Sequence, residues 1–254
     1  MNFPSLFIAK ILARWCFIMS TLLVLVVPAN GDEIPAKRQD AIRQLVREYL
    51  LANPEVIVEA LTAYEAQEEA RVRDEARRNL TAMQAEIFNN PQDPVMGNAA
   101  GDVTVVEFFD YQCGYCKRVV APLVEVMTAD RQIKLVLKEL PILGPASAFA
   151  AKAALAARRQ AAYDKLHFAL LAHRGRLSAE IVLQIAASIG LDVERLKADM
   201  KAPAIAAMIA ANQRLANALN VRGTPAFIIG DELIPGAVDA DGLRRLVAKA
   251  RENN

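Results

Sequence analysis

The chain has 254 residues, of which 54% are hydrophobic and 23% are charged, and its 30 basic side chains nearly balance its 29 acidic ones. This composition is typical of a globular protein with a hydrophobic core, long enough for one domain with an extension or for two small domains. The balanced charge gives no support for binding to nucleic acids or to acidic membrane surfaces, so we expect no nucleic-acid partner.

The first 31 residues are predicted to form an export signal. Lys10 and Arg14 are their only charged residues, and they precede an uncharged run at 15–27 and small residues at Ala29 and Gly31. As a helix this run would extend about 20 Å, which is short of the roughly 30 Å hydrocarbon layer of a membrane. An uncleaved leader that anchors the protein and a buried core helix are the alternatives. Export places the remaining chain in an oxidising compartment, where disulfides persist.

Residues 32–90 are predicted to form a helical segment. Apolar residues at helical spacing indicate a helix from Ala36 to Leu51, and Pro54 suits the first turn of a second helix that runs from Glu55 to about Phe88. The middle of the second helix is dominated by charged and amide side chains and buries little surface alone. One narrow apolar seam remains, made of Val72, Ala76, Leu80, Met83 and Ile87. We expect an oligomerising arm, and a single amphipathic helix lying on the main domain is the alternative.

The turn-rich stretch 89–98 separates this segment from a domain expected over residues 95–254. Strands are predicted in β-branched and aromatic stretches at 103–109, 133–139 and 226–229, the last followed by a tight turn and a return at 233–234. Helices are predicted at 117–127, at 243–251 and in a long block within about 146–219, which is interrupted near Gly175, at 190–192 and at Pro203. The order of elements indicates an α/β fold with an inserted helical subdomain.

Cys113-Gly114-Tyr115-Cys116 directly follows the first predicted strand, and these are the only cysteines besides Cys16 in the leader. A C-x-x-C pair that opens a helix closes a disulfide on itself. Unpaired N–H groups and the helix dipole stabilise a thiolate at the helix start. We therefore expect Cys113 to be the exposed nucleophile and Cys116 to resolve mixed disulfides from within. Gly114 and Tyr115 are expected to tune the balance between the reduced and the disulfide form of the pair, and neither offers a cation to the thiolate.

Other interpretations of the pair are weaker. A structural zinc site needs a second Cys or His pair, and His167 and His173, six residues apart, would point in different directions on one helix. We expect both histidines to be ordinary helical residues, and we expect no metal site and no cofactor. A purely structural disulfide of this kind restrains the unfolded chain little. Capture of a soft metal such as Cu(I) by both thiolates stays open as a second hypothesis.

Thr224 and Pro225 form a second motif, just before the last predicted strand. X–Pro bonds are the ones that adopt the cis form, and a proline at this place fits a tight bend. On spacing alone, a simple proline at the start of a strand is an equally good interpretation.

Together these residues resemble the DsbA family of thioredoxin-fold disulfide oxidoreductases. The segment 108–117 looks like the family's active-site segment, and 138–144, 150–157 and 223–225 follow in the family's order, so that the likeness covers about residues 95–252. The resemblance implies a thioredoxin-like fold with an inserted helical subdomain.

The resemblance also implies roles for particular residues. Thr224 and Pro225 would form a cis-proline loop that packs against the disulfide and pairs with the extended backbone of a substrate. Glu107 matches a buried acid beneath the active site that exchanges a proton with Cys116, and Val120 stands where the family has a second acid.

For two further residues near the motif, we favour a structural interpretation over a functional one. Asp110 and Lys138 are candidates for tuning the site, but we favour a turn residue at the strand end for Asp110 and a solvated side chain for Lys138.

Residues 34–88 are similar in length and character to the N-terminal segment of ScsC-like members, which trimerises. This likeness implies a homo-oligomer that holds several active sites together and raises the effective concentration of one site for a substrate held by another. We predict an exported, periplasmic thiol:disulfide oxidoreductase that acts on cysteine-containing exported proteins with a membrane redox partner. Isomerase or reductase activity is favoured; a dedicated disulfide donor and a Cu(I)-binding dithiol protein are the alternatives.

Overall fold

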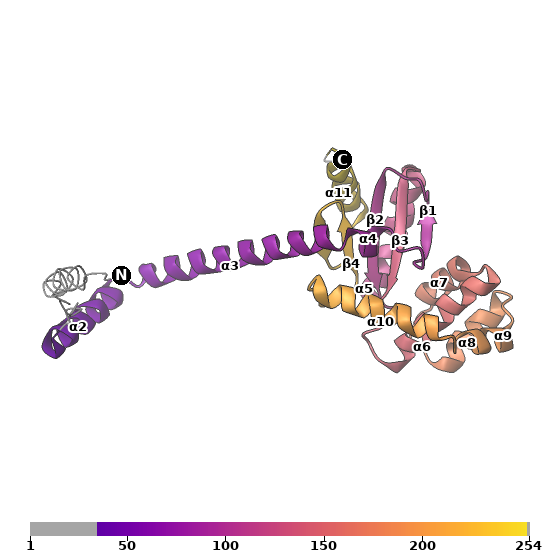
Figure 1. Cartoon of the computed structure of the whole chain (residues 1–254), viewed down its shortest axis with the longest axis horizontal. Coiled ribbons are helices and arrows are strands. Elements are labelled where there is room, and N and C mark those ends of the chain that lie inside the picture. The colour runs from indigo at the N-terminus through magenta and orange to yellow at the C-terminus, as the bar shows by residue number, and fades with distance from the viewer. Residues whose placement is uncertain (1–34, 253–254) are drawn as a thin grey trace, which may run out of the picture. The chain divides into compact units, whose positions relative to one another are not determined.

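The structure is a computed structural model that describes residues 35–252 (Figure 1). The export signal predicted for residues 1–31 therefore lies outside the described residues. The chain divides into two compact units, with the division between Tyr64 and Glu65, and each is described by itself. Among residues 35–252, no helix is both long enough and apolar enough to cross a membrane.

The first unit contains α2 (Ala36–Ala52) and the beginning of α3 (Glu55–Ala82). Asn53 ends α2, and its backbone and side-chain N–H groups both donate to the Tyr49 carbonyl, at 2.9 and 2.8 Å. Both helices begin where the sequence predicted. Their large apolar side chains lie exposed: Ile42, Leu45, Val46, Tyr49, Leu51, Ile57, Val58, Leu61 and Tyr64. This unit thus carries an apolar surface that no described residue covers.

The second predicted helix is not continuous to Phe88. α3 ends at Ala82, and a short helix, α4 (Gln84–Phe88), begins after a break at Met83. Leu80 before the break and Ile87 after it are both buried in one hydrophobic cluster with sheet residues such as Val106. The end of the predicted apolar seam therefore packs against the sheet of the second unit.

A sheet of five strands forms the centre of the second unit, in the order β1-β3-β2-β4-β5 (Figure 1). β2 and β3 are parallel and every other pair is antiparallel. The predicted strands are confirmed, and the short edge strand β1 was not predicted. The strands are β1 (Val95–Gly97), β2 (Val103–Phe109), β3 (Ile133–Glu139), β4 (Ala226–Ile229) and β5 (Glu232–Pro235).

Helices cover both faces of this sheet. α5 (Gly114–Ala129) and α11 (Ala240–Glu252) pack together on one face, while α4 and α10 (Pro203–Ala218) lie against the other. Because side chains alternate along a strand, Val105 and Phe109 of β2 face α5, and so does Glu107. The strand thereby places one carboxyl group inside the hydrophobic core beneath α5.

The expected helical insertion lies between β3 and β4. It ends with α10 and contains, before it, α6 (Pro145–Ala157), η1 (Arg158–Gln160), α7 (Tyr163–Ala172), α8 (Ala179–Ser188) and α9 (Val193–Asp199). Gly175 and Gly190 interrupt the block with φ angles of 103° and 87°, which glycine adopts without strain. Pro203 lies in the first turn of α10, as predicted.

Lys138 is not solvated, which corrects the expectation from the sequence. Its side chain is fully buried in β3, where it forms an ion pair with the equally buried Asp93 and donates to the Glu86 carbonyl at 2.6 Å. Burial raises the pKa of Asp93 and lowers the pKa of Lys138, and the charge of each partner opposes the shift of the other. The pair fastens the segment after α4 to the sheet.

Candidate active site

The turn between β2 and α5 is built around Asp110. One of its carboxylate oxygens accepts from the Gln112 N–H and the Ser147 hydroxyl, both at 2.7 Å, and the other accepts from the Leu143 N–H at 2.9 Å. The residue is buried, and its own carbonyl accepts from the Cys113 N–H at 3.0 Å. Asp110 is thus a turn residue, as favoured from the sequence, and it also ties the turn to α6.

Cys113 occupies the N-cap position of α5, and its sulfur accepts from the Cys116 N–H at 3.4 Å. Backbone N–H groups at a helix start carry partial positive charge, so this geometry stabilises negative charge on the Cys113 sulfur. Both cysteines are free thiols in this structure. The sequence thereby places the first sulfur of the pair at the positive end of the helix.

Cys113 is much less exposed than predicted. Its relative exposure is 6%, against 0% for Cys116, so the order of accessibility agrees with expectation but the nucleophile is largely covered. The cover comes from the loop before β4, since the Cys113 thiol donates to the Thr224 carbonyl at 3.1 Å. Only a partner that reaches this one sulfur at the surface has access to the pair.

The Thr224–Pro225 peptide bond is cis, as the resemblance implied. The Pro225 carbonyl accepts from the Gly236 N–H at 2.8 Å, beyond the β4–β5 hairpin. The structure therefore brings Thr224 beside Cys113, although 111 residues separate them in the sequence. Pairing of Thr224 and Pro225 with a substrate stays a prediction.

Glu107 lies in the core with no hydrogen-bonding partner among residues 35–252, and burial raises its pKa to about 8. Burial also raises the pKa of the Cys116 thiol, and the charge of Glu107 adds to that shift. The carboxyl and the second thiol therefore lie within electrostatic reach of each other, and exchange of a proton between them stays a prediction. Both groups are mainly protonated at neutral pH.

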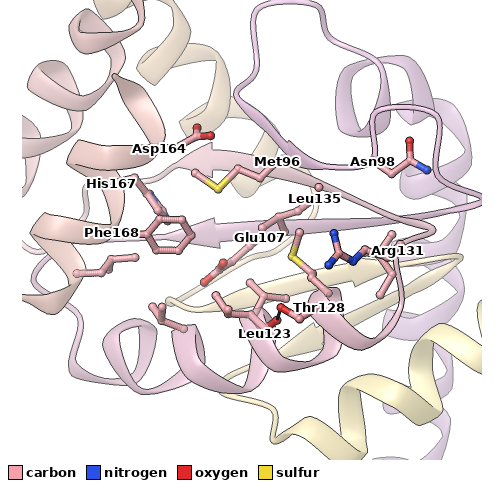
Figure 2. Close-up of a pocket in the computed structure, with 16 residues that line it drawn as sticks. Met96, Asn98, Glu107, Leu123, Thr128, Arg131, Leu135, Asp164, His167 and Phe168 are labelled. Carbon is pink, nitrogen blue, oxygen red and sulfur yellow. Dashed lines mark hydrogen bonds between the residues drawn. The ribbon is translucent and has the colours of Figure 1, made fainter. Parts of the chain in front are cut away.

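The Glu107 carboxyl opens into a cavity of about 540 Å³ between α5, α7 and the strands β1 and β3 (Figure 2). Figure 2 shows Glu107 reaching into this space from the sheet, with Leu123 on the α5 side and Phe168 on the α7 side. Val120, which stands where the family has a second acid, lines the same cavity. A valine therefore lines this cavity where the family has an acid, and Glu107 is the acidic side chain whose charge acts on Cys116.

A buried polar network under the motif was not predicted. One oxygen of Glu139 accepts from the hydroxyls of Tyr111 and Tyr163, at 2.8 and 3.0 Å. The Tyr111 hydroxyl also lies 3.1 Å from Nδ1 of His167. Burial raises the pKa of Glu139 well above its usual range and lowers that of His167 to about 3. The network holds Tyr111 in place two residues before Cys113.

The two histidines differ more than the sequence suggested. His167 lies on α7, as expected, but it is buried in this network rather than on a helix surface. His173 follows the last residue of α7 in an extended conformation, so it is not the helical residue that was expected, and its carbonyl accepts from Nζ of Lys117 at 2.6 Å. Neither contact leaves a signal in the sequence, because both join segments that are far apart along the chain.

Tyr115 is 58% exposed at the start of α5, and the Arg118 guanidinium carbon lies 4.1 Å from the centre of its ring. This geometry is a cation–π contact. Gly114 and Tyr115 themselves carry no positive charge, and the structure places one beside them, since Arg118 lies over the ring of Tyr115. The three-residue spacing on one helix was the signal that predicts such a contact.

Two protein families match this chain, one over the N-terminal helices and one over the part that contains the sheet. The DSBA-like thioredoxin domain matches residues 104–248, and the copper resistance protein ScsC N-terminal domain matches residues 39–71. The first match contains both cysteines and the Thr224–Pro225 loop. The second lies within the predicted oligomerisation segment.

Solved structures resemble the chain over most of their own length. A thioredoxin-like oxidoreductase from Silicibacter pomeroyi is 48% identical, with a TM-score of 0.65, over 66% of this chain and 97% of that protein. A linker-deletion variant of Proteus mirabilis ScsC is 27% identical, with a TM-score of 0.66, over 87% of this chain and 99% of the other.

A curated relative of a different kind is the Na(+)/H(+) antiporter NhaA 1 of Salinispora arenicola, which is 32% identical over 161 residues. The match covers 63% of this chain but only 25% of the antiporter. The chain thus spans about a quarter of the length of this relative.

Proposed function

Because the chain belongs to the family of DSBA-like thioredoxin domains, we propose that it is an exported thiol:disulfide oxidoreductase that acts on cysteine-containing proteins through Cys113 and Cys116. The observation that carries this proposal is the position of the Cys113 sulfur, at the N-terminus of α5 and against the Thr224 carbonyl. A sulfur at a helix start suits the role of nucleophile, and the backbone beside it supports the proposal that a substrate peptide binds there.

The exchange begins when the Cys113 thiolate attacks one sulfur of a substrate disulfide. A bond forms between Cys113 and that sulfur, the substrate disulfide breaks, and the released substrate thiolate takes a proton. In the fraction of molecules whose Glu107 is ionised, Cys116 then gives its proton to the Glu107 carboxylate, and the Cys116 thiolate attacks the Cys113 sulfur. The protein disulfide closes and the second substrate thiolate leaves, so that two electrons pass from the protein to the substrate. The oxidising direction is the exact reverse.

Glu107 suits the role of proton acceptor for Cys116. Its pKa of about 8 lies close to neutral pH, where a buried group exchanges protons most effectively. The thiol needs such help because its burial disfavours the thiolate. We therefore assign the second step, and not the first, to Glu107.

We place substrate peptides against Thr224 and Pro225. A peptide joined to Cys113 by a mixed disulfide starts within reach of the Thr224 backbone, since the Cys113 sulfur already contacts its carbonyl. Tyr115, exposed beside the same sulfur, offers an aromatic surface to the residues that flank the substrate cysteine.

Correction of wrong disulfides is the activity that we favour within this class. Helices α2 and α3 carry exposed apolar side chains, and a match to the ScsC N-terminal domain covers 39–71. Burial of these side chains between copies of the chain would form a homo-oligomer, with a trimer as the expected form. Several active sites held together raise the local concentration of the nucleophile around a misfolded substrate. A dedicated disulfide donor is the competing assignment.

The periplasm is the proposed location, with a membrane redox partner that resets the pair after each turnover. The predicted export signal supports this location, because disulfides persist in oxidising compartments.

The test is reduction of insulin by dithiothreitol in the presence of the mature chain. We expect catalysis by the parent and none by Cys113→Ser. Equal catalysis by both would remove the proposal. Refolding of scrambled ribonuclease then separates an isomerase from a donor, since only an isomerase restores activity without an added oxidant.

Capture of Cu(I) is a second candidate function. The match of residues 39–71 to a copper resistance protein domain favours it, and thiolates are the ligands that Cu(I) prefers. Titration of the reduced chain with Cu(I), in competition with dithiothreitol, is the test. Binding no tighter than that of dithiothreitol removes this candidate.

A further inference from the structure

We propose that four arginines around the reactive pair, Arg118, Arg174, Arg176 and Arg222, form a basic rim that selects substrates with acidic side chains next to their reactive cysteine. The inference rests on the proposed thiol–disulfide exchange and adds a substrate class to it.

Two hydrogen bonds bring the loop that carries Arg174 and Arg176 to the motif. At one end, Nζ of Lys117 donates to the His173 carbonyl at 2.6 Å. At the other end, the Leu177 N–H donates to the Gln112 side chain at 3.2 Å. Both arginines lie between these two bonds, and Gln112 and Lys117 flank the C-x-x-C motif itself.

The other two arginines lie on separate segments next to the same sulfur. Arg222 is two residues before Thr224, whose carbonyl contacts the Cys113 sulfur. Arg118 lies in the first turns of α5 and stacks on the ring of Tyr115. Positive charge therefore approaches the pair from α5, from the loop after α7 and from the loop before β4.

All four arginines are exposed, and none forms an ion pair with an acidic side chain of residues 35–252. Arginines elsewhere in the second unit do form such pairs: Arg251 binds Asp102 and Asp130. The chain as a whole is nearly neutral, so this concentration of unpaired positive charge is local.

No exposed acid balances the rim within the segments that surround the pair, at 110–118, 141–148, 173–178 and 221–226. The single acid in them is Asp110, which is buried and accepts three hydrogen bonds. Ile142 and Leu143, in the loop tied to Asp110, are 40% and 49% exposed and add apolar surface to this face. The face thus fits an extended peptide that combines acidic and apolar residues.

The partner that this face fits is a cysteine-containing protein segment with Asp or Glu on both sides of the cysteine. Clustered charges of one sign raise the rate of encounter with an oppositely charged partner by about 10- to 1000-fold, and salt weakens the effect. Because exposed charges are screened over about 8–10 Å at physiological salt, only acids close to the substrate cysteine contribute.

The test uses the full chain, oxidised to the Cys113–Cys116 disulfide and freed of oxidant, and three peptides with one cysteine flanked on each side by two Asp, two Ser or two Lys. The peptide thiolate attacks the Cys113 sulfur, the Cys113–Cys116 bond breaks, and a mixed disulfide and a Cys116 thiolate form. Its rate is measured by acid quenching and mass spectrometry. Each rate is divided by the rate of the same peptide with 2-hydroxyethyl disulfide, which removes differences in intrinsic thiol reactivity.

We expect the Asp peptide to react about tenfold faster than the Lys peptide at low salt, and the ratio to fall toward one in about 0.5 M salt. Arg174→Glu/Arg176→Glu should bring the ratio to one or below. Arg222→Glu, in the separate loop before β4, should also lower the ratio. The matched control is Arg78→Glu/Arg214→Glu, which reverses two exposed charges on α3 and α10 and should leave the ratio unchanged.

Different results would contradict the proposed thiol–disulfide exchange and the proposed basic rim. If the Ser peptide does not react with the parent, the proposed exchange is wrong. If the Ser peptide reacts but the Asp-to-Lys ratio is near one, or is the same in the parent and both rim variants, the basic rim has no role in selection and the inference is overturned.

Discussion

The sulfur of Cys113 lies 3.1 Å from the backbone carbonyl oxygen of Thr224, so the nucleophile and the loop before β4 form one surface. This contact explains how a helix-start cysteine is only 6% exposed and still the accessible member of its pair. A substrate that reacts with Cys113 has to meet Thr224 at the same time, and the two contacts together define where a peptide binds.

Glu107 is expected to make folding stability depend on pH. Its pKa is about 8 in the folded chain, against 4.5 when exposed. Below pH 4.5 the carboxyl is protonated in both states, so its ionisation makes no difference to stability. Between pH 4.5 and 8 the unfolded chain ionises while the folded chain does not, so stability falls as pH rises, by on the order of 3–5 kcal/mol in total.

Glu107→Gln stays neutral at every pH and removes this dependence. The free energy of unfolding in urea, variant minus parent, should therefore increase from pH 5 to 8 and level off above that. A difference that stays constant between pH 5 and 9 would show that the carboxyl titrates normally.

The same substitution should slow the second chemical step. Without the Glu107 carboxylate, Cys116 has no buried proton acceptor, and the mixed disulfide on Cys113 should persist about tenfold longer or more. Quenched reactions with a peptide disulfide, followed by mass spectrometry, measure this lifetime. Glu125→Gln, on the surface of α5, is the control and should leave this lifetime unchanged. Equal lifetimes in all three proteins would exclude Glu107 as the acceptor.

Removal of one partner from the buried Lys138–Asp93 pair is predicted to destabilise the fold strongly. Lys138→Met leaves the Asp93 carboxylate buried without its partner, which should cost about 3–5 kcal/mol of unfolding free energy. Lys138→Met/Asp93→Leu should recover most of this loss, because the buried charge is gone. Urea unfolding measures both.

A surface pair provides the comparison. Arg77 and Asp231 lie 2.6 Å apart with both side chains exposed, so Arg77→Met should cost less than about 1 kcal/mol. A Lys138→Met variant as stable as Arg77→Met would contradict the burial of the pair.

The exposed apolar side chains of α2 should hold the oligomer together. Leu45→Asp/Tyr49→Asp replaces two of them and should lower the mass of the full chain in solution to that of a monomer, as measured by light scattering. Gln44→Asp/Arg47→Asp, at polar positions of the same helix, should leave the oligomer intact. A parent that is already monomeric, or a double variant with unchanged mass, would contradict the oligomerising arm.

The strands that carry the site could be predicted from the sequence because they are buried and parallel. Such strands are continuous runs of apolar, mainly β-branched residues, and both 103–109 and 133–139 match β2 and β3 residue for residue. The three-residue strand β1 escaped prediction, since its only distinguishing property is its pairing with β3.

What the sequence did not predict depends on partners far along the chain. Lys138 was expected in solvent because its partner Asp93 lies 45 residues away, in a stretch predicted as turns. The network of Glu139, Tyr111, Tyr163 and His167 joins three separate elements. Arg118, by contrast, carried a local signal in its spacing from Tyr115.

In the proposed exchange, Cys113 forms, and Cys116 resolves, a mixed disulfide with protein substrates. The mass of Cys116→Ser after incubation with a protein that contains a disulfide tests both roles. We expect a stable covalent adduct at Cys113 that dithiothreitol removes, and no adduct with Cys113→Ser. Failure of Cys116→Ser to form any adduct, or an equal adduct in both variants, would contradict the proposed exchange.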